Sequence, residues 1–346
     1  GQGLKKLLHS LFVISPARYL SLDGQNVVIL SENKEVGRIP LHNLEAIVTF
    51  GYTGASPGLM GACAKNNISL SFMTASGKFL ARVTGEIKGS VTLRREQYRI
   101  ADNENKSMQI ARNFITGKIF NSKWVIERAI RDYPMRLNTE KLKIKSDFLS
   151  KSLQQIRNAT EEEHIRGIEG EAASVYFSVL DDLILQQKED FYYKTRSKRP
   201  PLDNVNAMLS FAYALLAGMC ASALETVGLD PYVGFLHKDK PGRISLALDM
   251  MEELRAVMAD RFVITMINKK IVSGDGFIQK ENGAVILDDE TRKKFLSAWQ
   301  SRKQETIVHP FLEEKIEWGL VPFVQAMLLA RYIRGDLDEY PPFMWK

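Results

Sequence analysis

The sequence contains few residues that could form disulfides or thiolate metal sites. Among 346 residues there are only two cysteines, Cys63 and Cys220, and neither lies in a CxxC or similar spacing. Two cysteines do not form a disulfide framework, so we expect a reducing, cytoplasmic environment. The N-terminus shows no signal-peptide pattern. The sequence also has no GxxxxGK(S/T) motif, the usual phosphate-binding loop for a nucleoside triphosphate.

A strong charge imbalance and an evident membrane segment are also missing. The formal net charge is +6, which is compatible with a phosphate-bearing partner but does not by itself indicate one. One uncharged run, residues 204–224, approaches the length needed to cross a bilayer. This run is rich in Ala, Ser and Asn and contains Tyr213, so we expect a buried helix and no membrane association.

The hydrophobic period changes along the chain from that of strands to that of helices. Asp23-Gly24 lies between two short apolar runs and predicts a hairpin. From about Arg95 onward the pattern is helical. We expect strands at residues 19–22, 27–30, 45–50, 68–73 and 79–83, and long helices at 106–131 and 139–157. The prediction is an α+β, two-domain protein: a β-rich domain at 1–90, a larger all-α domain at 96–346, and a join at 88–96.

A histidine precedes a helix that carries several acidic residues. His237 lies in a loop, and Ser245 begins a predicted helix containing Asp249, Glu252 and Glu253. Residues three and four apart share a helix face, so these acids should form one patch opposite an apolar stripe. An imidazole beside clustered carboxylates suits an oxygen-preferring divalent metal. The alternative is the solvated face of an amphipathic helix.

A second helix is predicted from residue 160, where Thr160 and Glu163 would form a capping box. At a helical period, Glu169 falls in the middle of the apolar stripe of this helix. A carboxylate facing a core must be neutral, paired or metal-bound. Gly167 and Gly170 flank it, and two glycines inside a helix suggest close approach of another backbone or a ligand. The alternative is a Glu169 paired with an Arg or Lys.

A basic and aromatic loop, residues 191–201, is the candidate for nucleic-acid contact. Phe191, Tyr192 and Tyr193 would stack on bases or wedge against them. The cationic side chains would contact phosphates. These are Lys194, Arg196, Lys198 and Arg199. The alternative is a solvated basic loop. Asp203 is expected to cap the next helix, and the aromatic tail at residues 340–346 is expected to dock on its own helical domain.

Several runs together resemble a known family. GIEGEAA at 167–173, GFLH at 234–237, SLALDMMEE at 245–253 and RPPLDNVNAMLS at 199–210 are similar to the CRISPR-associated protein one family, and closest to members from type I-C systems. That family comprises DNA endonucleases and integrases that insert spacers into CRISPR arrays. The resemblance extends over nearly the whole chain.

The resemblance implies functional residues and partners. Its metal-site glutamate falls on Glu169, its histidine on His237, and its acidic pair on Asp249 and Glu252, which leaves open which of that pair is the direct ligand. Asn206 and Tyr213 lie on a matching helix and would contact DNA or line the site. The resemblance also implies a homodimer formed through the β-rich part, double-stranded spacer and repeat DNA as substrates, and CRISPR-associated proteins two and four as partners.

The residue types alone favour Mg²⁺ or Mn²⁺, because one imidazole with several carboxylates and no thiolate suits these ions better than structural zinc. The resemblance implies that the reaction is attack of a spacer 3′-hydroxyl on a repeat phosphodiester. Two alternatives use the same residues differently. One is a metal-dependent nuclease acting on branched DNA or RNA, and the other is a DNA-binding scaffold without chemistry.

Overall fold

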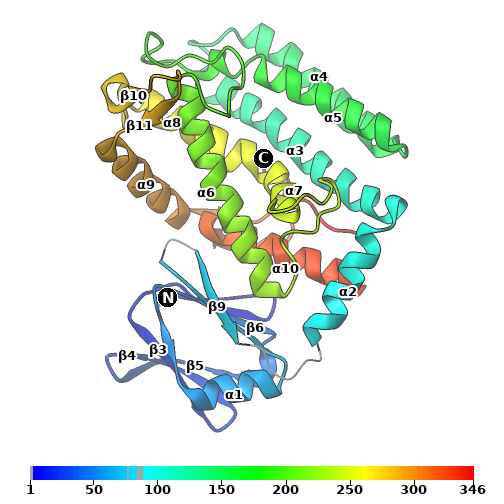
Figure 1. Ribbon diagram of the computed structural model, residues 1–346, viewed down its shortest axis with the longest axis vertical. Coiled ribbons are helices and arrows are strands. Elements are labelled where there is room, and N and C mark those ends of the chain that lie inside the picture. Colours follow the sequence, from blue (N-terminus) through cyan, green and yellow to red (C-terminus); the bar gives the residue numbers. More distant parts are fainter. Residues whose placement is uncertain (1–2, 76–77, 84–88) are drawn as a thin grey trace. The chain divides into compact units, whose positions relative to one another are not determined.

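The computed structural model describes residues 3–75, 78–83 and 89–346. Its chain forms two compact units (Figure 1). The first unit comprises Gly1–Glu104, Gly218–Ala247 and Pro322–Tyr340, and the second comprises Asn105–Ala217, Leu248–Val321 and Pro341–Lys346. The N-terminal part is β-rich and the rest is mainly helical, so the predicted α+β class is confirmed. The predicted join at 88–96 begins at residue 88, which lies outside the described residues, and it stays a prediction.

Two sheets form the β-rich part of the first unit. One has the order β1-β2-β6-β8-β9 and the other the order β5-β4-β3-β7. Their strands are β1 (Leu4–Leu7), β2 (Ser10–Val13), β3 (Arg18–Asp23), β4 (Asn26–Ser31), β5 (Lys34–Pro40), β6 (Ala46–Phe50), β7 (Gly54–Ala55), β8 (Ser69–Met73) and β9 (Phe79–Val83). The predicted hairpin is present: Asp23 pairs with Asn26, and Gly24 adopts a left-handed φ of +61° in the turn.

The core of these strands is apolar and includes one short helix. Buried side chains of both sheets, such as Leu20 and Ile47, belong to a single hydrophobic cluster. Helix α1 (Pro57–Lys65) contributes Leu59 and Cys63 to the same cluster. Burial of this kind contributes roughly 25 cal/mol per Å² of apolar surface. Consecutive buried residues of the central strands, as in β2 and β6, thus supply much of the stability of this part.

The first unit also fixes the segment that leads to His237. Helix α2 (Gly89–Ala101) carries Gln97, which is fully buried. The Gln97 amide nitrogen donates to the carbonyls of Asp230 and Val233 at 2.8 and 2.9 Å, and its oxygen accepts from the Asp230 amide at 2.9 Å. One side chain therefore satisfies three backbone groups just before residue 237.

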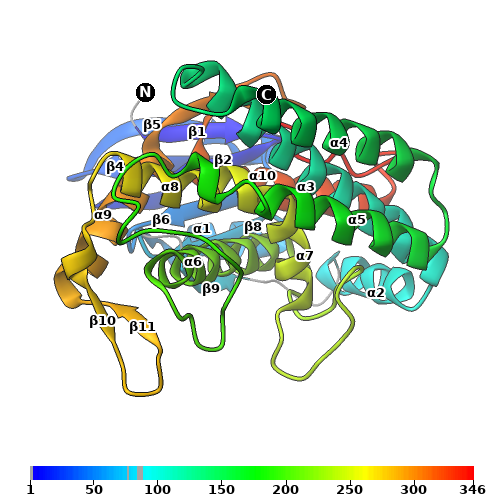
Figure 2. The same cartoon turned by 90° about the horizontal axis from the view of Figure 1, so that it is seen from above.

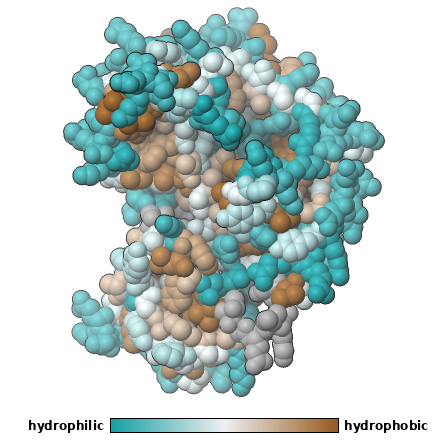
Figure 3. All heavy atoms as spheres, viewed as in Figure 1, coloured by the Kyte–Doolittle hydropathy of each residue, from teal (hydrophilic) through white to brown (hydrophobic). Residues whose placement is uncertain are grey.

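The second unit is a set of long helices, whose arrangement is seen from above in Figure 2. Helices α4 and α5 pack against each other, and in both views α3 runs beside them (Figures 1 and 2). Hydrophilic side chains cover much of α4 and α5 (Figure 3). Its helices are α3 (Glu104–Asp132), α4 (Thr139–Asn158), α5 (Glu162–Phe177), α8 (Arg261–Asn268) and α9 (Asp289–Gln304), and its two small hairpins are β10–β11 (Phe277–Gln279, Val285–Leu287) and β12–β13 (Thr306–Val308, Lys315–Glu317). Helices α6 (Asn204–Val227) and α7 (Ser245–Leu254) each have residues in both units, and α10 (Val321–Arg334) belongs to the first unit apart from Val321.

Helix α6 is the uncharged run identified in the sequence. Asp203 Oδ1 accepts from the Asn206 amide at 2.7 Å, which confirms the predicted cap. By length and composition α6 could cross a membrane, but 56% of its most apolar window is buried inside the protein. A core helix meets the same criterion, and α6 packs as one.

The aromatic tail docks within the second unit, as predicted. Phe343 is fully buried, and Asn121 of α3 donates to the carbonyls of Glu253 and Phe343, both at 2.6 Å. The Trp345 amide donates to Asn121 Oδ1 at 3.0 Å. The Trp345 ring lies 3.4 Å from the Arg128 guanidinium, a close cation–π contact. The tail thereby joins α3 to α7.

Candidate active site

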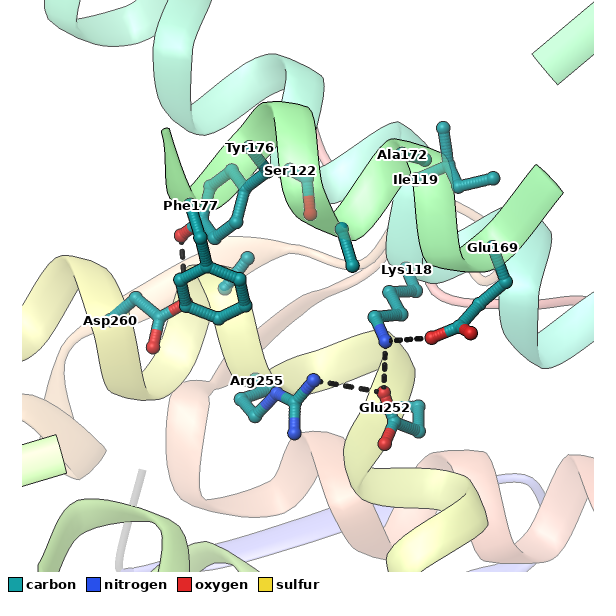
Figure 4. Close-up of a pocket in the computed structure, with 12 residues that line it drawn as sticks. Lys118, Ile119, Ser122, Glu169, Ala172, Tyr176, Phe177, Glu252, Arg255 and Asp260 are labelled. Carbon is teal, nitrogen blue, oxygen red and sulfur yellow. Dashed lines mark hydrogen bonds and ion pairs between the residues drawn. The ribbon is translucent and has the colours of Figure 1, made fainter. Parts of the chain in front are cut away.

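A pocket in the second unit brings together side chains from α3, α5 and α7 (Figure 4). The Lys118 ammonium lies between two carboxylates: it forms a short ion pair with Glu169 and lies 2.8 Å from Glu252. Arg255 donates to the same Glu252 oxygen at 3.1 Å. The remaining lining residues are Ile119, Ser122, Ala172, Ala173, Tyr176, Phe177, Ala256 and Asp260. Two acids distant in sequence thus converge on one cation.

Helix α5 positions Glu169 differently from the sequence prediction in two respects. The N-cap is Glu161 and makes no side-chain cap, so the predicted Thr160 capping box is wrong. The expected backbone approach at Gly167 and Gly170 is also wrong, because a Cβ on either would meet no atom of the described residues within 4 Å. The stripe around Glu169 is present, with Ile165 and Ala172 buried. The alternative of a Glu169 paired with a basic residue is realised by Lys118.

The acids of α7 do not form a solvated face. Asp249 and Glu253 are both fully buried, and the Glu252 side chain is 12% exposed. The expected division into an acidic and an apolar side is therefore wrong, because α7 is covered nearly all round. Glu253 Oε2 accepts from the Phe343 amide at 3.3 Å, so this acid holds the tail. Of the pair left open, the described lining of the pocket includes Glu252 and not Asp249.

His237 lies in the first unit, on the half-buried segment between α6 and α7. Within the described part of the chain, no three His, Cys, Asp or Glu side chains are gathered closely enough to hold a metal ion by themselves. The carboxylates that the pocket does bring together are Glu169 and Glu252, with Lys118 between them. The assignment of His237 and Asp249 to a metal site stays a prediction.

The other end of the pocket contains a buried acid bound by two tyrosines. Asp260 accepts hydrogen bonds from the hydroxyls of Tyr213 and Tyr176, the latter at 2.7 Å. Burial raises the pKa of Asp260, and the two hydroxyls and the Arg255 charge only partly offset that rise. Burial also raises the pKa of both tyrosines, and the nearby Asp260 charge raises it further, so they are neutral donors. Tyr213 is thus bound to a residue that lines the pocket, and its predicted contact with DNA stays a prediction.

A π-helical segment, η3 (Arg255–Asp260), positions these residues between α7 and α8. Such insertions are rare and occur often at functional sites. Burial alone would lower the pKa of Arg255, but the Glu252 carboxylate, followed by Tyr213 and Asp260, outweighs that effect and raises it. Arg255 therefore stays a cation beside Glu252.

Sequence reasoning missed Lys118, Arg255 and Asp260. Lys118 lies among the buried residues of α3, next to Gly117 and Ile119, although lysine is seldom buried without a partner. A lysine on an apolar stripe is the counterpart of the glutamate found on the α5 stripe. The lysine on an apolar stripe could therefore have been recognised in the sequence. No sequence pattern indicates the π-helical segment that directs Arg255 and Asp260 toward the pocket.

The loop at 191–201 is only partly open to solvent. Phe191 is fully buried against Phe277, and Tyr193 is 6% exposed and stacks on Phe177, so their predicted role as base-stacking residues is wrong. Tyr192 remains exposed. Lys194, Lys198 and Arg199 are exposed as well.

Asn206 and Arg196 organise this loop from within. Asn206 is fully buried, so the structure does not present it to DNA as predicted. Its side chain donates to the Thr195 carbonyl at 2.8 Å and accepts from Arg196 at 2.7 Å and from the Ser197 amide at 3.1 Å. The Arg196 guanidinium also lies 5.3 Å from the Tyr213 ring, which connects the loop to the tyrosine bound by Asp260.

Comparison with solved structures places this fold in one class. The solved structures of a casposase bound to integration product and of a partial Cas6-RT-Cas1–Cas2 complex share the fold, with TM-scores of 0.78 and 0.75 at 22% and 20% identity. Each match covers 99% of this chain and 100% of the other.

Sequence comparison identifies the family directly. The model of the family described as CRISPR associated protein Cas1 matches residues 11–301. A relative from Chlorobaculum tepidum, named CRISPR-associated endonuclease Cas1 1, is 49% identical over 343 residues, which is 99% of this chain and all of the relative. The chain belongs to the Cas1 family. The resemblance stated from the sequence is confirmed, and the type I-C subtype stays a prediction.

Proposed function

We propose that this chain is a metal-dependent DNA endonuclease and integrase that inserts spacer DNA into CRISPR arrays. Membership of the Cas1 family supports an endonuclease, since the relative above carries that name, and the fold shared with a casposase bound to integration product supports DNA joining. The observation that carries the proposal is the convergence of Glu169 and Glu252 on one cation in a pocket.

The residues present fit an oxygen-preferring divalent ion. Two carboxylates already bind a cation in a partly enclosed pocket, and no thiolate lines it among the described residues. Hard cations such as Mg²⁺ and Mn²⁺ take such oxygen ligands. Glu169 and Glu252 would hold the ion, and the family resemblance adds His237 and Asp249. When bound, the ion would polarise the phosphodiester and stabilise the charge that develops on phosphorus oxygens.

The surrounding side chains orient the carboxylates and the DNA. Arg255 fixes the Glu252 carboxylate, and the neutral Tyr213 and Tyr176 hold Asp260 at the far end of the pocket. The exposed cations Lys194, Lys198 and Arg199 would pair with DNA phosphates. The attacking group would be the 3′-hydroxyl of a spacer precursor. The bond broken and the bond made are both phosphodiesters, so no nucleotide triphosphate is required.

The partners proposed follow from the family. A solved structure that shares this fold is a partial Cas6-RT-Cas1–Cas2 complex, which supports Cas2 as a partner here. Double-stranded spacer and repeat DNA are the proposed substrates. A homodimer formed through the β-rich part and an association with CRISPR-associated protein four rest on the resemblance, and the cytoplasmic location stays a prediction.

The test is strand joining of a labelled spacer duplex to a repeat target in Mn²⁺. Glu169→Gln and Glu252→Gln should each lower the rate by about a thousandfold or more, because several kcal/mol of transition-state stabilisation are lost. DNA binding, followed by fluorescence anisotropy, should persist. His237→Ala tests the predicted histidine in the same assay. The matched control is Glu171→Gln, an exposed carboxylate on the same helix.

Retention of joining by both glutamine variants would refute the assignment. A substrate panel addresses the alternative nuclease, since faster cleavage of unrelated RNA than of repeat DNA would favour it. Calorimetry addresses the scaffold: a wild-type protein that takes up no Mn²⁺ and joins no DNA would favour binding without chemistry.

A further inference from the structure

Lys118 occupies the position between the carboxylates that the proposed function gives to a metal. Its side chain is 10% exposed, so it is largely desolvated, and its ammonium contacts both Glu169 and Glu252 (Figure 4). Transfer of an ammonium from water is costly unless it is paired. The pairing with both acids compensates that cost. Because Glu169 lies on α5 and Glu252 on α7, the same two contacts link these helices through Lys118.

The two carboxylates at this position are already paired with cations. Lys118 and Arg255 are matched by Glu169 and Glu252. The remaining acid of the lining, Asp260, is bound by two tyrosine hydroxyls at the other end of the pocket. A divalent ion bound to both carboxylates would lie within a few ångströms of the Lys118 ammonium, and like charges at that distance repel strongly. For the ion to bind both carboxylates, one of the two cations must move away from them.

The structure distinguishes which cation can move. The Arg255 guanidinium lies 5.2 Å from the Tyr213 ring and donates to Glu252, so stacking and hydrogen bonding both fix it. An Arg guanidinium is planar, so moving it breaks directional hydrogen bonds and stacking together. A Lys ammonium is a compact charge on a flexible side chain and can move with a smaller loss of interaction energy. Lys118 has the flexible stem, and its ammonium rather than the Arg255 guanidinium contacts both carboxylates.

We propose that Lys118 is the resident counter-ion of the metal site: it holds Glu169 and Glu252 in place while no metal is bound, and a divalent ion enters by displacing its ammonium. This inference rests on the proposed function, because it takes the carboxylate pair as the metal site. It makes Lys118 a positioning residue that sets metal affinity through competition.

The experiment compares wild type with Lys118→Met by Mn²⁺ calorimetry and by thermal unfolding. Without metal, the variant should unfold at a lower temperature, because two carboxylates then face each other without the ammonium. It should bind Mn²⁺ at least about tenfold more tightly, since a unit charge a few ångströms from a divalent ion weakens its binding by more than that. Mn²⁺ should therefore raise the melting temperature more in the variant than in wild type.

Lys123→Met is the matched control. Lys123 is a half-buried lysine on the same helix that pairs with Glu127 instead of the pocket acids. Its loss should leave Mn²⁺ affinity at the wild-type value. If Lys118→Met fails to fold, lysine acetylation of the wild-type protein, mapped by mass spectrometry, replaces it: Mn²⁺ should increase modification of Lys118 and not of Lys123.

The outcomes separate this inference from the proposed function. Unchanged or weaker Mn²⁺ binding by Lys118→Met, with strand joining intact in wild type, overturns the counter-ion role and leaves the function standing. Unchanged acetylation of Lys118 on Mn²⁺ addition has the same meaning. Absence of both Mn²⁺ uptake and strand joining in wild type and variant overturns both.

Discussion

At the scale of single residues, Asn206 determines the shape of the proposed DNA-binding loop. The buried side chain accepts from Arg196 and the Ser197 amide and donates to the Thr195 carbonyl, so it joins three consecutive residues of the loop. The exposed lysines of the same loop make no comparable set of internal contacts in the described structure. Removal of the buried Asn206 amide should therefore lower the stability of the protein, whereas removal of an exposed lysine in the same loop should weaken DNA binding.

We expect Asn206→Ala to lower the free energy of unfolding by about 2–4 kcal/mol, because several buried partners lose their hydrogen bonds. Lys198→Ala should leave stability within about 0.5 kcal/mol of wild type and should weaken DNA binding with a shallower salt dependence. Urea unfolding and anisotropy titrations at several salt concentrations measure both effects. An Asn206→Ala protein of wild-type stability would contradict the structural role.

At the scale of elements, α3 and α7 approach closely at Gly117. A Cβ at this position would lie 2.9 Å from Glu253 Cβ, closer than two such atoms can approach, and 3.1 Å from Pro342 Cβ, which is also tight. The glycine therefore permits the packing that sets Lys118 on α3 near Glu252 on α7, with the tail over both.

Gly117→Ala should destabilise the protein by about 1–3 kcal/mol through overpacking. Gly170→Ala is the matched control, since its Cβ would meet no described atom within 4 Å. An unstrained alanine in a helix interior should instead stabilise by roughly 0.5–1 kcal/mol. Chemical unfolding of both variants measures the difference, and a stabilising Gly117→Ala would show that the helices can separate without cost.

Helices α3 and α4 are joined by one carboxylate, Glu127. It accepts from Lys143 at 2.9 Å, from Lys123 at 3.2 Å and from the Ser146 hydroxyl. Burial alone would raise the pKa of Glu127, but these three donors outweigh it and lower the pKa from 4.5 to about 2. A lowered pKa means that the charged form stabilises the folded state, fully above about pH 5.

Glu127→Gln should thus lower the free energy of unfolding by roughly 1–3 kcal/mol at neutral pH, and this difference should shrink toward zero as pH falls from about 5 to about 2. Urea unfolding at several pH values measures it. The exposed Glu140 of α4 provides the control, Glu140→Gln, with little change at any pH. If the difference in free energy of unfolding between wild type and Glu127→Gln stays constant down to pH 2, Glu127 does not act through its charge.

At the scale of the whole molecule, local patterns predicted the elements well. The five expected strands appear as β3, β4, β6, β8 and β9, and the two long helices as α3 and α4, within a few residues. Strands β1, β2, β5 and β7 and the two late hairpins were not predicted. Most of them pair with a neighbouring segment, as β1 does with β2 and β5 does with β4, but they are short or lack a clear apolar alternation. Strand β7 has only two residues and pairs with the distant β3, so no local pattern marks it.

The sequence predicted the site only where a charged residue interrupted the apolar stripe of a helix. Glu169 stood out because a carboxylate interrupted an apolar stripe, and its basic partner was foreseen in kind but not in identity. Lys118 lies on another helix, so its pairing with Glu169 depends on tertiary packing and cannot be predicted from the local sequence. Phe191 and Tyr193 were misassigned for the same reason: Phe277 and Phe177, which bury them, are not neighbours in sequence.

The most direct test of the central claim is anomalous diffraction from crystals soaked in Mn²⁺ above its measured Kd. We predict a peak that contacts the carboxylates of both Glu169 and Glu252, with the Lys118 ammonium moved away from them. Bound Mn²⁺ elsewhere, with these two carboxylates still paired to Lys118 at saturation, would contradict it.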